Sequence, residues 1–247
     1  MIQVIGNGWN ITSCDDSHQK LAEAVYGIFS TFVGKKLENN ILVRNDLSQG
    51  FPIALYEKNN EDWEIILSCA SGTHWAQMAY QLAHELCHLY CNHSSSRGHK
   101  HKWFEESLCE CASIAVLYKL GSDWNNFEIS AYNATYGVDI TNYINDVTNS
   151  VTTIFESNKY FACWLLNNIP KLESCSTQRD INRIIAVHLF NSILNQSPEN
   201  WVAITSLNLW DCYLNDRFND FIESWLSASD KNINEVCKFA DILKSAD

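Results

Sequence analysis

The stretch His74–Cys91, HWAQMAYQLAHELCHLYC, carries the strongest pattern in this chain of 247 residues. Its apolar residues recur at helical spacing and Thr73 precedes it as a candidate N-cap, so the stretch is predicted to form an amphipathic helix. On such a helix His84 and His88 lie on one face, because they are four residues apart, and both imidazoles can bind one metal ion. Glu85 points about 100° around the helix, where it can reach a water molecule on that ion rather than the ion itself.

Further elements are predicted on both sides of this helix from the same periodicities. Before it, the sequence predicts a helix over 17–32 and strands over 40–44, 52–57 and 63–69. After a loop rich in Ser, His and Lys, it predicts a second helix over 103–120, with Gly121 as the C′ residue that ends it. Beyond Phe155 the predicted helices cover 156–169, 177–196, 215–227 and 234–245. These elements together indicate an α+β fold.

The composition restricts the classes of partner and compartment. The formal net charge is −12, and the sequence has no cluster of Lys and Arg that would form a basic patch. Both features disfavour nucleic acids and anionic membranes as partners. No apolar run reaches the roughly 18–20 residues that span a bilayer, and the first residues lack the basic and apolar regions of a secretory signal. If this is the whole chain, we therefore expect it to be cytoplasmic. Its ten cysteines are then expected to be thiols.

Several of these cysteines fall within predicted helices, where Cys acts as a small buried hydrophobe. The residues with this expected role are Cys87, Cys91, Cys109, Cys111 and Cys163. The spacing of Cys109 and Cys111 is not that of a structural zinc site, and no CxxC pair completes one.

The second predicted helix supplies candidates for a third metal ligand, which would leave the fourth position for water. It begins with Trp103–Glu110, WFEESLCE, and offers the carboxylates of Glu105 and Glu106. Three histidines of the preceding loop are the alternatives, although a polar loop holds a ligand less rigidly than a helix does. These are His93, His99 and His101.

The sequence HELCH followed by WFEESLCE resembles the gluzincin metallopeptidases, which are HExxH zinc enzymes whose third ligand is a Glu on the next helix. The resemblance implies that His84, His88 and Glu106 bind Zn²⁺, and that Glu110 supports the first histidine. Glu105 fits less well as the ligand, because Cys109 would then take the supporting position.

Related patterns fit less well. The metzincins need Gly three residues and His six residues after the second histidine, where this chain has Cys91 and Ser94. No GxMEN motif of the aminopeptidases precedes the helix.

The activity implied by the resemblance is hydrolysis of peptide bonds in a peptide or protein substrate. Zinc would lower the pKa of its water towards about 7 and polarise the carbonyl, while Glu85 would transfer the proton to the leaving amine. Tyr160 and His188 are the candidates for a donor to the oxyanion, although an aromatic side chain and a histidine at such positions also suit a packed core. The resemblance also implies that the strand Trp63–Cys69 forms the sheet edge to which an extended peptide adds.

The expected domain organisation follows from these parts. Residues 1–121 would form a zincin-like lobe with a small sheet and two metal-binding helices, and 122–150 would be a connecting segment. Residues 151–247 would form a helical lobe that closes the active-site cleft, because hydrolysis needs a wall that excludes water.

Two alternative functions use the same residues. Two histidines and one carboxylate also form the ligand set of non-haem Fe(II) oxygenases, so a protein hydroxylase is one alternative. A catalytically inactive zincin that binds a partner is the other.

Overall fold

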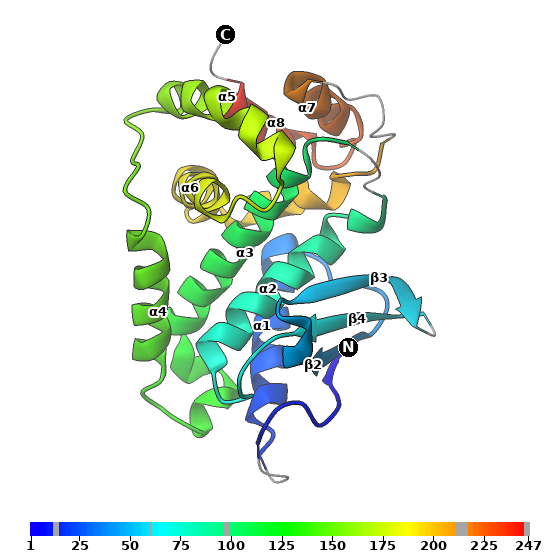
Figure 1. The fold of residues 1–247 in the computed structure, drawn as a ribbon, viewed down its shortest axis with the longest axis vertical. Helices are drawn as coiled ribbons and strands as arrows, with labels where there is room; N and C mark the ends of the chain where they lie inside the picture. The colour runs from blue at the N-terminus through cyan, green and yellow to red at the C-terminus, as the bar shows by residue number, and fades with distance from the viewer. Residues whose placement is uncertain (12–14, 60, 96–98, 211–216, 245–247) are drawn as a thin grey trace. The chain divides into compact units, whose positions relative to one another are not determined.

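The computed structural model describes residues 1–11, 15–59, 61–95, 99–210 and 217–244 (Figure 1). It combines helices with one small sheet, so the predicted α+β class is confirmed. The chain forms two compact units that interleave along the sequence. The first comprises 1–31, 35–89 and 112–148, and the second comprises 32–34, 90–111 and 149–247. The sequence suggests boundaries at 121 and 150. In the structure the first unit includes 112–148, and 90–111 belong to the second unit.

The sheet of the first unit has the strand order β1-β2-β4-β3 (Figure 1). Its strands are β1 (Ile2–Val4), β2 (Ile41–Asn45), β3 (Ile53–Asn59) and β4 (Asp62–Leu67). β1, β2 and β4 are parallel, and β3 is antiparallel to β4. The three predicted strands are confirmed, but the prediction that Trp63–Cys69 forms the edge is wrong. β4 pairs with β2 on one side and with its hairpin partner β3 on the other, so the edge strands are β3 and β1.

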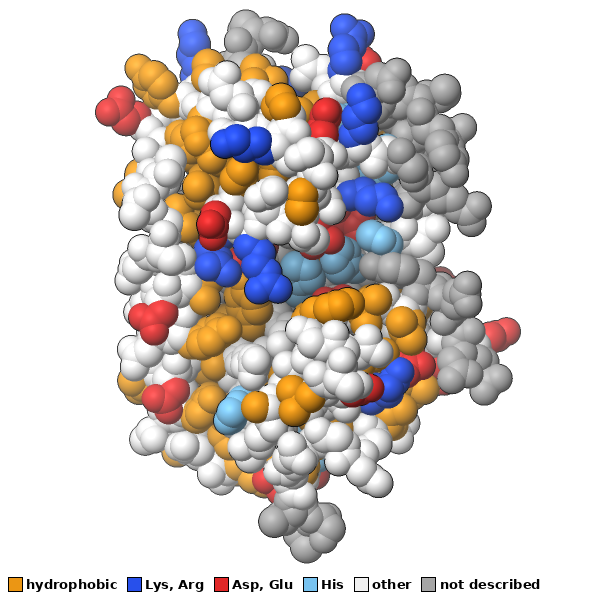
Figure 2. All heavy atoms as spheres, in the orientation of Figure 1, with side chains coloured by type: hydrophobic (Ala, Val, Ile, Leu, Met, Phe, Trp, Pro, Cys, Tyr) orange, Lys and Arg blue, Asp and Glu red, His pale blue; other side chains and the backbone are white. Residues whose placement is uncertain are grey.

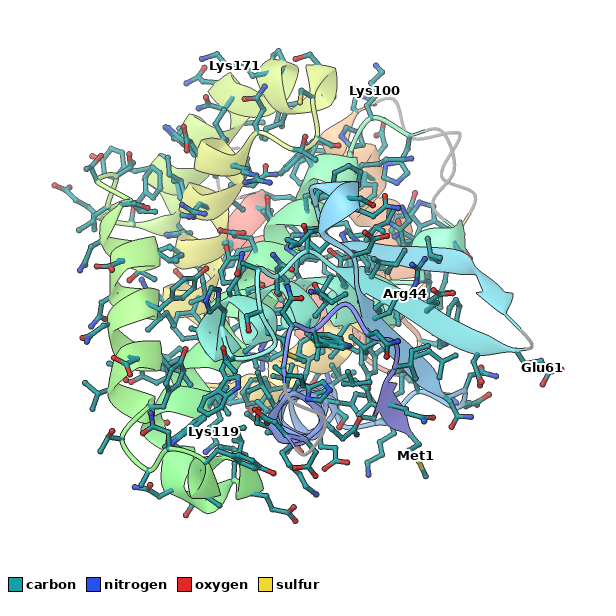
Figure 3. All side chains as sticks on the ribbon, turned by 60° about the horizontal axis from the view of Figure 1, so that its bottom comes forward. Met1, Arg44, Glu61, Lys100, Lys119 and Lys171 are labelled. Carbon is teal, nitrogen blue, oxygen red and sulfur yellow. The ribbon has the colours of Figure 1, made fainter. Side chains whose placement is uncertain are left out.

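Ion pairing and turn geometry shape this sheet. Arg44 on β2 forms an ion pair with Glu64 on the neighbouring strand β4. Figure 3 shows Arg44 on the sheet and Glu61 at the outer end of the β3–β4 hairpin. Glu61 has a φ of 73°, the left-handed backbone that a tight turn requires there.

Two helices of the first unit follow the predicted pattern closely. They are α1 (Ser17–Val33) and α2 (Trp75–Tyr90). α1 buries Leu21, Val25 and Phe29, whose spacing of four residues places them on one stripe. α2 likewise buries Leu82 and Leu86, so its apolar face packs into the core and its orientation is fixed.

The helix that follows extends past its predicted end. α3 (Lys102–Ser122) contains Gly121 as a helical residue, so the prediction that Gly121 is the C′ residue is wrong. Close packing accounts for the glycine at this position, because a Cβ on Gly121 would lie 3.0 Å from Oγ1 of Thr141 in α4 (Gly137–Asn149). A Cβ on Gly137 would lie 2.6 Å from Cβ of Trp124. The two glycines therefore allow α4 to lie against the end of α3.

The segment 122–150, which the sequence analysis describes as a connecting segment, contains helices. It holds two 3-10 helices, η3 (Trp124–Asn126) and η4 (Glu128–Ala131), before α4 begins. Trp124 stacks on Trp75 of α2 with ring centroids 6.0 Å apart, and this aromatic contact anchors the segment within the first unit.

The second unit is helical apart from its loops. After 149 its elements are α5 (Asn158–Ser174), α6 (Arg179–Leu189), a π-helical turn (Phe190–Leu194), a 3-10 helix (Pro198–Ser206), α7 (Phe218–Ser227) and α8 (Ile233–Leu243). These confirm the four predicted helices, although 215, 216 and 245 lie outside the described residues. Trp225 packs between two aromatic residues of this unit. Its ring centroid lies 5.6 Å from that of Phe104 and 5.5 Å from that of Phe239. Of the helices in the described ranges, none is both long and apolar enough to cross a membrane.

Candidate metal centre

α2 presents the residues of the HExxH motif near its C-terminal end. His84 and His88 lie on one face with ring centroids 5.1 Å apart, as the spacing predicts. His88 is 5% exposed and Glu85 is 4% exposed, whereas His84 is half-buried. Histidine side chains reach the surface beside acidic side chains on the face drawn in Figure 2. The motif therefore combines two adjacent imidazoles with a carboxylate that is largely shielded from solvent.

Two groups of candidate ligands occur among the described residues, and within each group the ligand atoms all lie within 4.8 Å of one another. One group is His84, His88 and Cys109, and the other is His88, His93 and Glu105. The loop alternative His93 thus belongs to a candidate group. Glu106, which is half-buried on α3, belongs to neither, and its role as third ligand remains a prediction.

The carboxylate of Glu105 is buried, and each of its two oxygens contacts another side chain. Only 2% of the residue is exposed. Oε1 lies 2.5 Å from Nδ1 of His93, and Oε2 accepts a hydrogen bond of 2.8 Å from Nδ2 of Asn208. Sequence reasoning missed Asn208, because it follows Glu105 by 103 residues and no local pattern connects the two.

Glu110 has a partner that the sequence did not indicate. Nε of Arg183 on α6 donates to Oε1 of Glu110 at 2.8 Å, and both side chains are at most one quarter exposed. The expected support of His84 by Glu110 thus remains a prediction, while the ion pair shows that Glu110 also fastens α6 to α3. The sequence carries no signal for this pairing other than the opposite charges.

The other loop histidines are core residues. His99 is 8% exposed, and its ring lies 5.3 Å from that of Phe221. Burial lowers the pKa of His99 to about 4, which favours the neutral imidazole. His101 is fully buried, with its ring 5.3 Å from that of Phe221. Neither histidine belongs to a candidate ligand group among the described residues.

The two candidates for an oxyanion donor differ in their surroundings. His188 stacks on Phe161 with ring centroids 4.0 Å apart, and its Nε2 lies 3.1 Å from Oδ1 of Asn158. Burial lowers the pKa of His188 to about 4. Tyr160 lies on α5 and is 61% exposed, so its ring is not part of the core. Its role as a donor to the oxyanion remains a prediction.

The cysteines in the described ranges are free thiols. Cys87, Cys91, Cys109 and Cys111 are buried as predicted, whereas Cys163 is exposed on α5, so its predicted burial is wrong. Helical periodicity did not identify the buried face of α5, because its apolar residues are scattered around the helix. Burial raises the pKa of the Cys111 thiol well above its usual range.

No family model matches the sequence, and comparisons with curated proteins and with solved structures gave no match. The function of the chain is therefore inferred from the residues of the candidate centre alone.

Proposed function

We propose that this chain is a zinc-dependent peptidase of the gluzincin type. The observation that supports the proposal most is the HExxH motif on α2, where His84 and His88 face the same side and Glu85 is shielded from solvent. Two metal-binding imidazoles with a carboxylate one residue after the first form the arrangement that zinc peptidases use.

The available donors fit zinc. Zn²⁺ takes imidazole nitrogen, carboxylate oxygen and thiolate sulfur, and the candidate groups offer all three. We propose that His84, His88 and Glu106 hold the ion, with Cys109 as the competing third ligand. When bound, zinc would supply Lewis acidity that activates water and polarises a carbonyl.

The residues of the chain would then move the protons. A carboxylate oxygen of Glu85 would accept a proton from the attacking water and deliver it to the nitrogen of the leaving amine. The low exposure of Glu85 supports this role, because bulk water screens the electrostatic interactions of a shielded carboxylate less than those of an exposed one. Proton transfer of this kind typically contributes about 10²–10⁴-fold to the rate.

The edge strand β3 offers a place for the substrate backbone. One side of Ile53–Asn59 pairs with β4, and the other side has no strand neighbour in the described sheet. An extended peptide can add there as a further strand through main-chain hydrogen bonds, which hold a peptide without selecting its sequence. This supports a peptide as the substrate rather than a small molecule.

A second candidate function is a non-haem Fe(II) protein hydroxylase. It is favoured by the group of His88, His93 and Glu105, which consists of two histidines and one carboxylate. It leaves Glu85 without a task, so we rank it below the peptidase.

Metal analysis together with a peptide-cleavage assay tests the proposal. We expect about one zinc per chain, hydrolysis of a mixed fluorogenic peptide library, loss of hydrolysis with a chelator and recovery with added Zn²⁺. Glu85→Gln is the control for contaminating peptidases. Iron in the purified protein, or a zinc-loaded chain that cleaves no peptide in the library, would contradict the peptidase.

A further inference from the structure

The second unit contains a surface recess of about 410 Å³ that is lined by α5 and by the start of α7. α5 contributes Leu166, Ile169 and Glu173, which are three and four residues apart and so lie on one face of the helix. The other lining residues among those described are Arg217–Asp220. The recess therefore lies within one unit, and its volume falls in the range of about 300–1,000 Å³ that is typical of small-molecule sites.

The recess has an apolar part that is held in place. The ring of Phe218 is 5% exposed and lies 4.9 Å from the ring of Trp103 and 5.6 Å from that of His101. Leu166, by contrast, is 45% exposed, and Ile169 is half-buried. A ligand that covers Leu166 and Ile169 would remove apolar surface from water, which favours binding.

Two of the charged groups in the recess neutralise each other. Nε and Nη2 of Arg217 donate to Oδ2 and Oδ1 of Asp220, at 3.1 and 3.4 Å. Asp220 follows Arg217 by three residues, so the pair forms within the first turn of α7. This pairing leaves the carboxylate of Glu173 as the charge in the lining that Arg217 does not balance.

The carboxylate of Glu173 has no cationic side chain beside it in the described part of the chain. No Lys or Arg there forms an ion pair with it. Its Oε1 lies 3.7 Å from Nδ1 of His101, which is longer than a hydrogen bond. The side chain is 25% exposed, so water screens its charge only in part. Glu173 can therefore attract a cation that enters the recess.

These features select one kind of ligand. An ammonium group carries a positive charge and three donors, which suit a partly shielded carboxylate. An anion would be repelled by Glu173, and a wholly apolar ligand would desolvate the carboxylate without giving it a hydrogen bond. An apolar stem behind the ammonium group would cover Leu166 and Ile169.

We propose that the recess between α5 and the start of α7 binds an alkylammonium ion, with the charged nitrogen at Glu173 and the apolar stem against Leu166 and Phe218. The proposal goes beyond the peptidase function and does not depend on the metal centre. A free alkylamine and the side chain of a lysine offer the same chemistry, so the experiment distinguishes these two sources.

Titrations of the full-length chain with small probes, followed by the NMR signals of the backbone amides, test the proposal. Hexylamine carries the required groups, 1-hexanol is its neutral counterpart and hexanoate is its anionic one. Nα-acetyl-lysine N-methylamide represents a lysine side chain. The variants are Glu173→Gln, which removes the charge and keeps the shape, and Leu166→Gln, which removes apolar surface. Glu156→Gln is the matched control, because Glu156 precedes α5 and does not line the recess.

We expect hexylamine to bind at one site with a Kd of about 1 mM and to shift the amide signals of the lining residues on α5 and α7. Glu173→Gln should weaken this binding about 10-fold and Leu166→Gln about 5-fold, whereas Glu156→Gln should leave it unchanged. 1-Hexanol should bind at least about 10-fold more weakly than hexylamine, because it lacks the charge. Removal of metal with a chelator should change none of these values.

The lysine derivative identifies the source of the ligand. Tighter binding of the derivative than of hexylamine would support a lysine side chain as the ligand, and weaker binding would support a free amine.

Three outcomes would overturn the proposal. The first is equal affinity for 1-hexanol and hexylamine, which would make the recess an apolar surface without selectivity for charge. The second is unchanged affinity for hexylamine in Glu173→Gln, and the third is a set of shifted amides that lies outside α5 and α7. If Glu173→Gln does not fold, the comparison of hexylamine with 1-hexanol on the unaltered chain and on Leu166→Gln still decides the question.

Discussion

Arg183 donates from Nε to Oε1 of Glu110 at 2.8 Å, across 73 residues of sequence. The pair joins α6 to the first half of α3 within the second unit. The guanidinium is one quarter exposed and the carboxylate less, so water screens their attraction only in part. The carboxylate of Glu110, one turn after Glu106, is thus paired with Arg183 of α6.

The first prediction separates the two roles of Glu110. In a double-mutant cycle of Arg183→Gln and Glu110→Gln, the pair should contribute about 1–3 kcal/mol to the free energy of unfolding in urea. Glu110→Ala should in addition weaken zinc binding about 10–100-fold if it supports His84. Equal losses of zinc affinity in Arg183→Gln and Glu110→Ala would instead assign the effect to the anchoring of α6.

The second prediction concerns the general base. Glu85→Gln should keep the metal and the fold but lower kcat about 10²–10⁴-fold, because the amide cannot accept the proton from water. Metal content and peptide cleavage measured on the same sample check this. Loss of the metal from the variant would identify Glu85 as a ligand and refute the assignment.

The third prediction compares the candidate third ligands on α3. Glu106→Ala should weaken zinc binding strongly, because a ligand oxygen is lost, whereas Cys109→Ala should retain most of the affinity. Zinc titrations of the two variants decide between them. The reverse result would identify the thiolate, which belongs to the group with His84 and His88, as the ligand.

The fourth prediction follows from the low pKa of His188. Its pKa is about 4 in the folded chain, against an ordinary value of 6.5, because burial disfavours the charged ring. Between these values the unfolded chain binds a proton that the folded chain does not, so the free energy of unfolding falls as the pH decreases from 6.5 towards 4. In His188→Phe, which keeps a ring against Phe161, denaturation curves should show a shallower decline over this window. An identical decline would show that other groups cause the acid sensitivity.

The fifth prediction tests Tyr160 as the donor to the oxyanion. Tyr160→Phe should lower kcat about 10²–10³-fold with little change in KM, since the lost bond forms only in the transition state. Tyr118→Phe, another exposed tyrosine, is the matched control. Unchanged kcat in Tyr160→Phe would exclude the residue from the mechanism.

The helices and the metal-binding face could be predicted because their signals are local. The HExxH spacing of α2 and the apolar stripe of α1 each repeat within a few turns, so periodicity alone identifies them. β1 was missed because three residues are too few to show alternation, and its strand forms only through pairing with β2. α4 was missed because its sequence, GVDITNYINDVTN, is poor in strong helix formers. Packing against α3, which Gly121 and Gly137 permit, stabilises it instead.

The surroundings of the centre could not be predicted, because they come from distant parts of the chain. Asn208 and Arg183 reach Glu105 and Glu110 only after the second unit has folded, and asparagine or arginine at these positions carries no local signature. The sequence offered Glu105 and Glu106 as adjacent carboxylates. Only the fold distinguishes them, by burying Glu105 between His93 and Asn208 and leaving Glu106 half-buried.

The interleaving of the two units sets an order of events during synthesis. Residues 90–111 pack with 149–247, which leave the ribosome later. At translation rates of roughly 5–20 residues per second, the 103 residues between Glu105 and Asn208 represent a delay of about 5–20 s. During that interval the nascent chain carries the histidines of α2 without the groups that orient Glu105. The buried carboxylate of Glu105 therefore acquires its partner Asn208 only after residue 208 has left the ribosome.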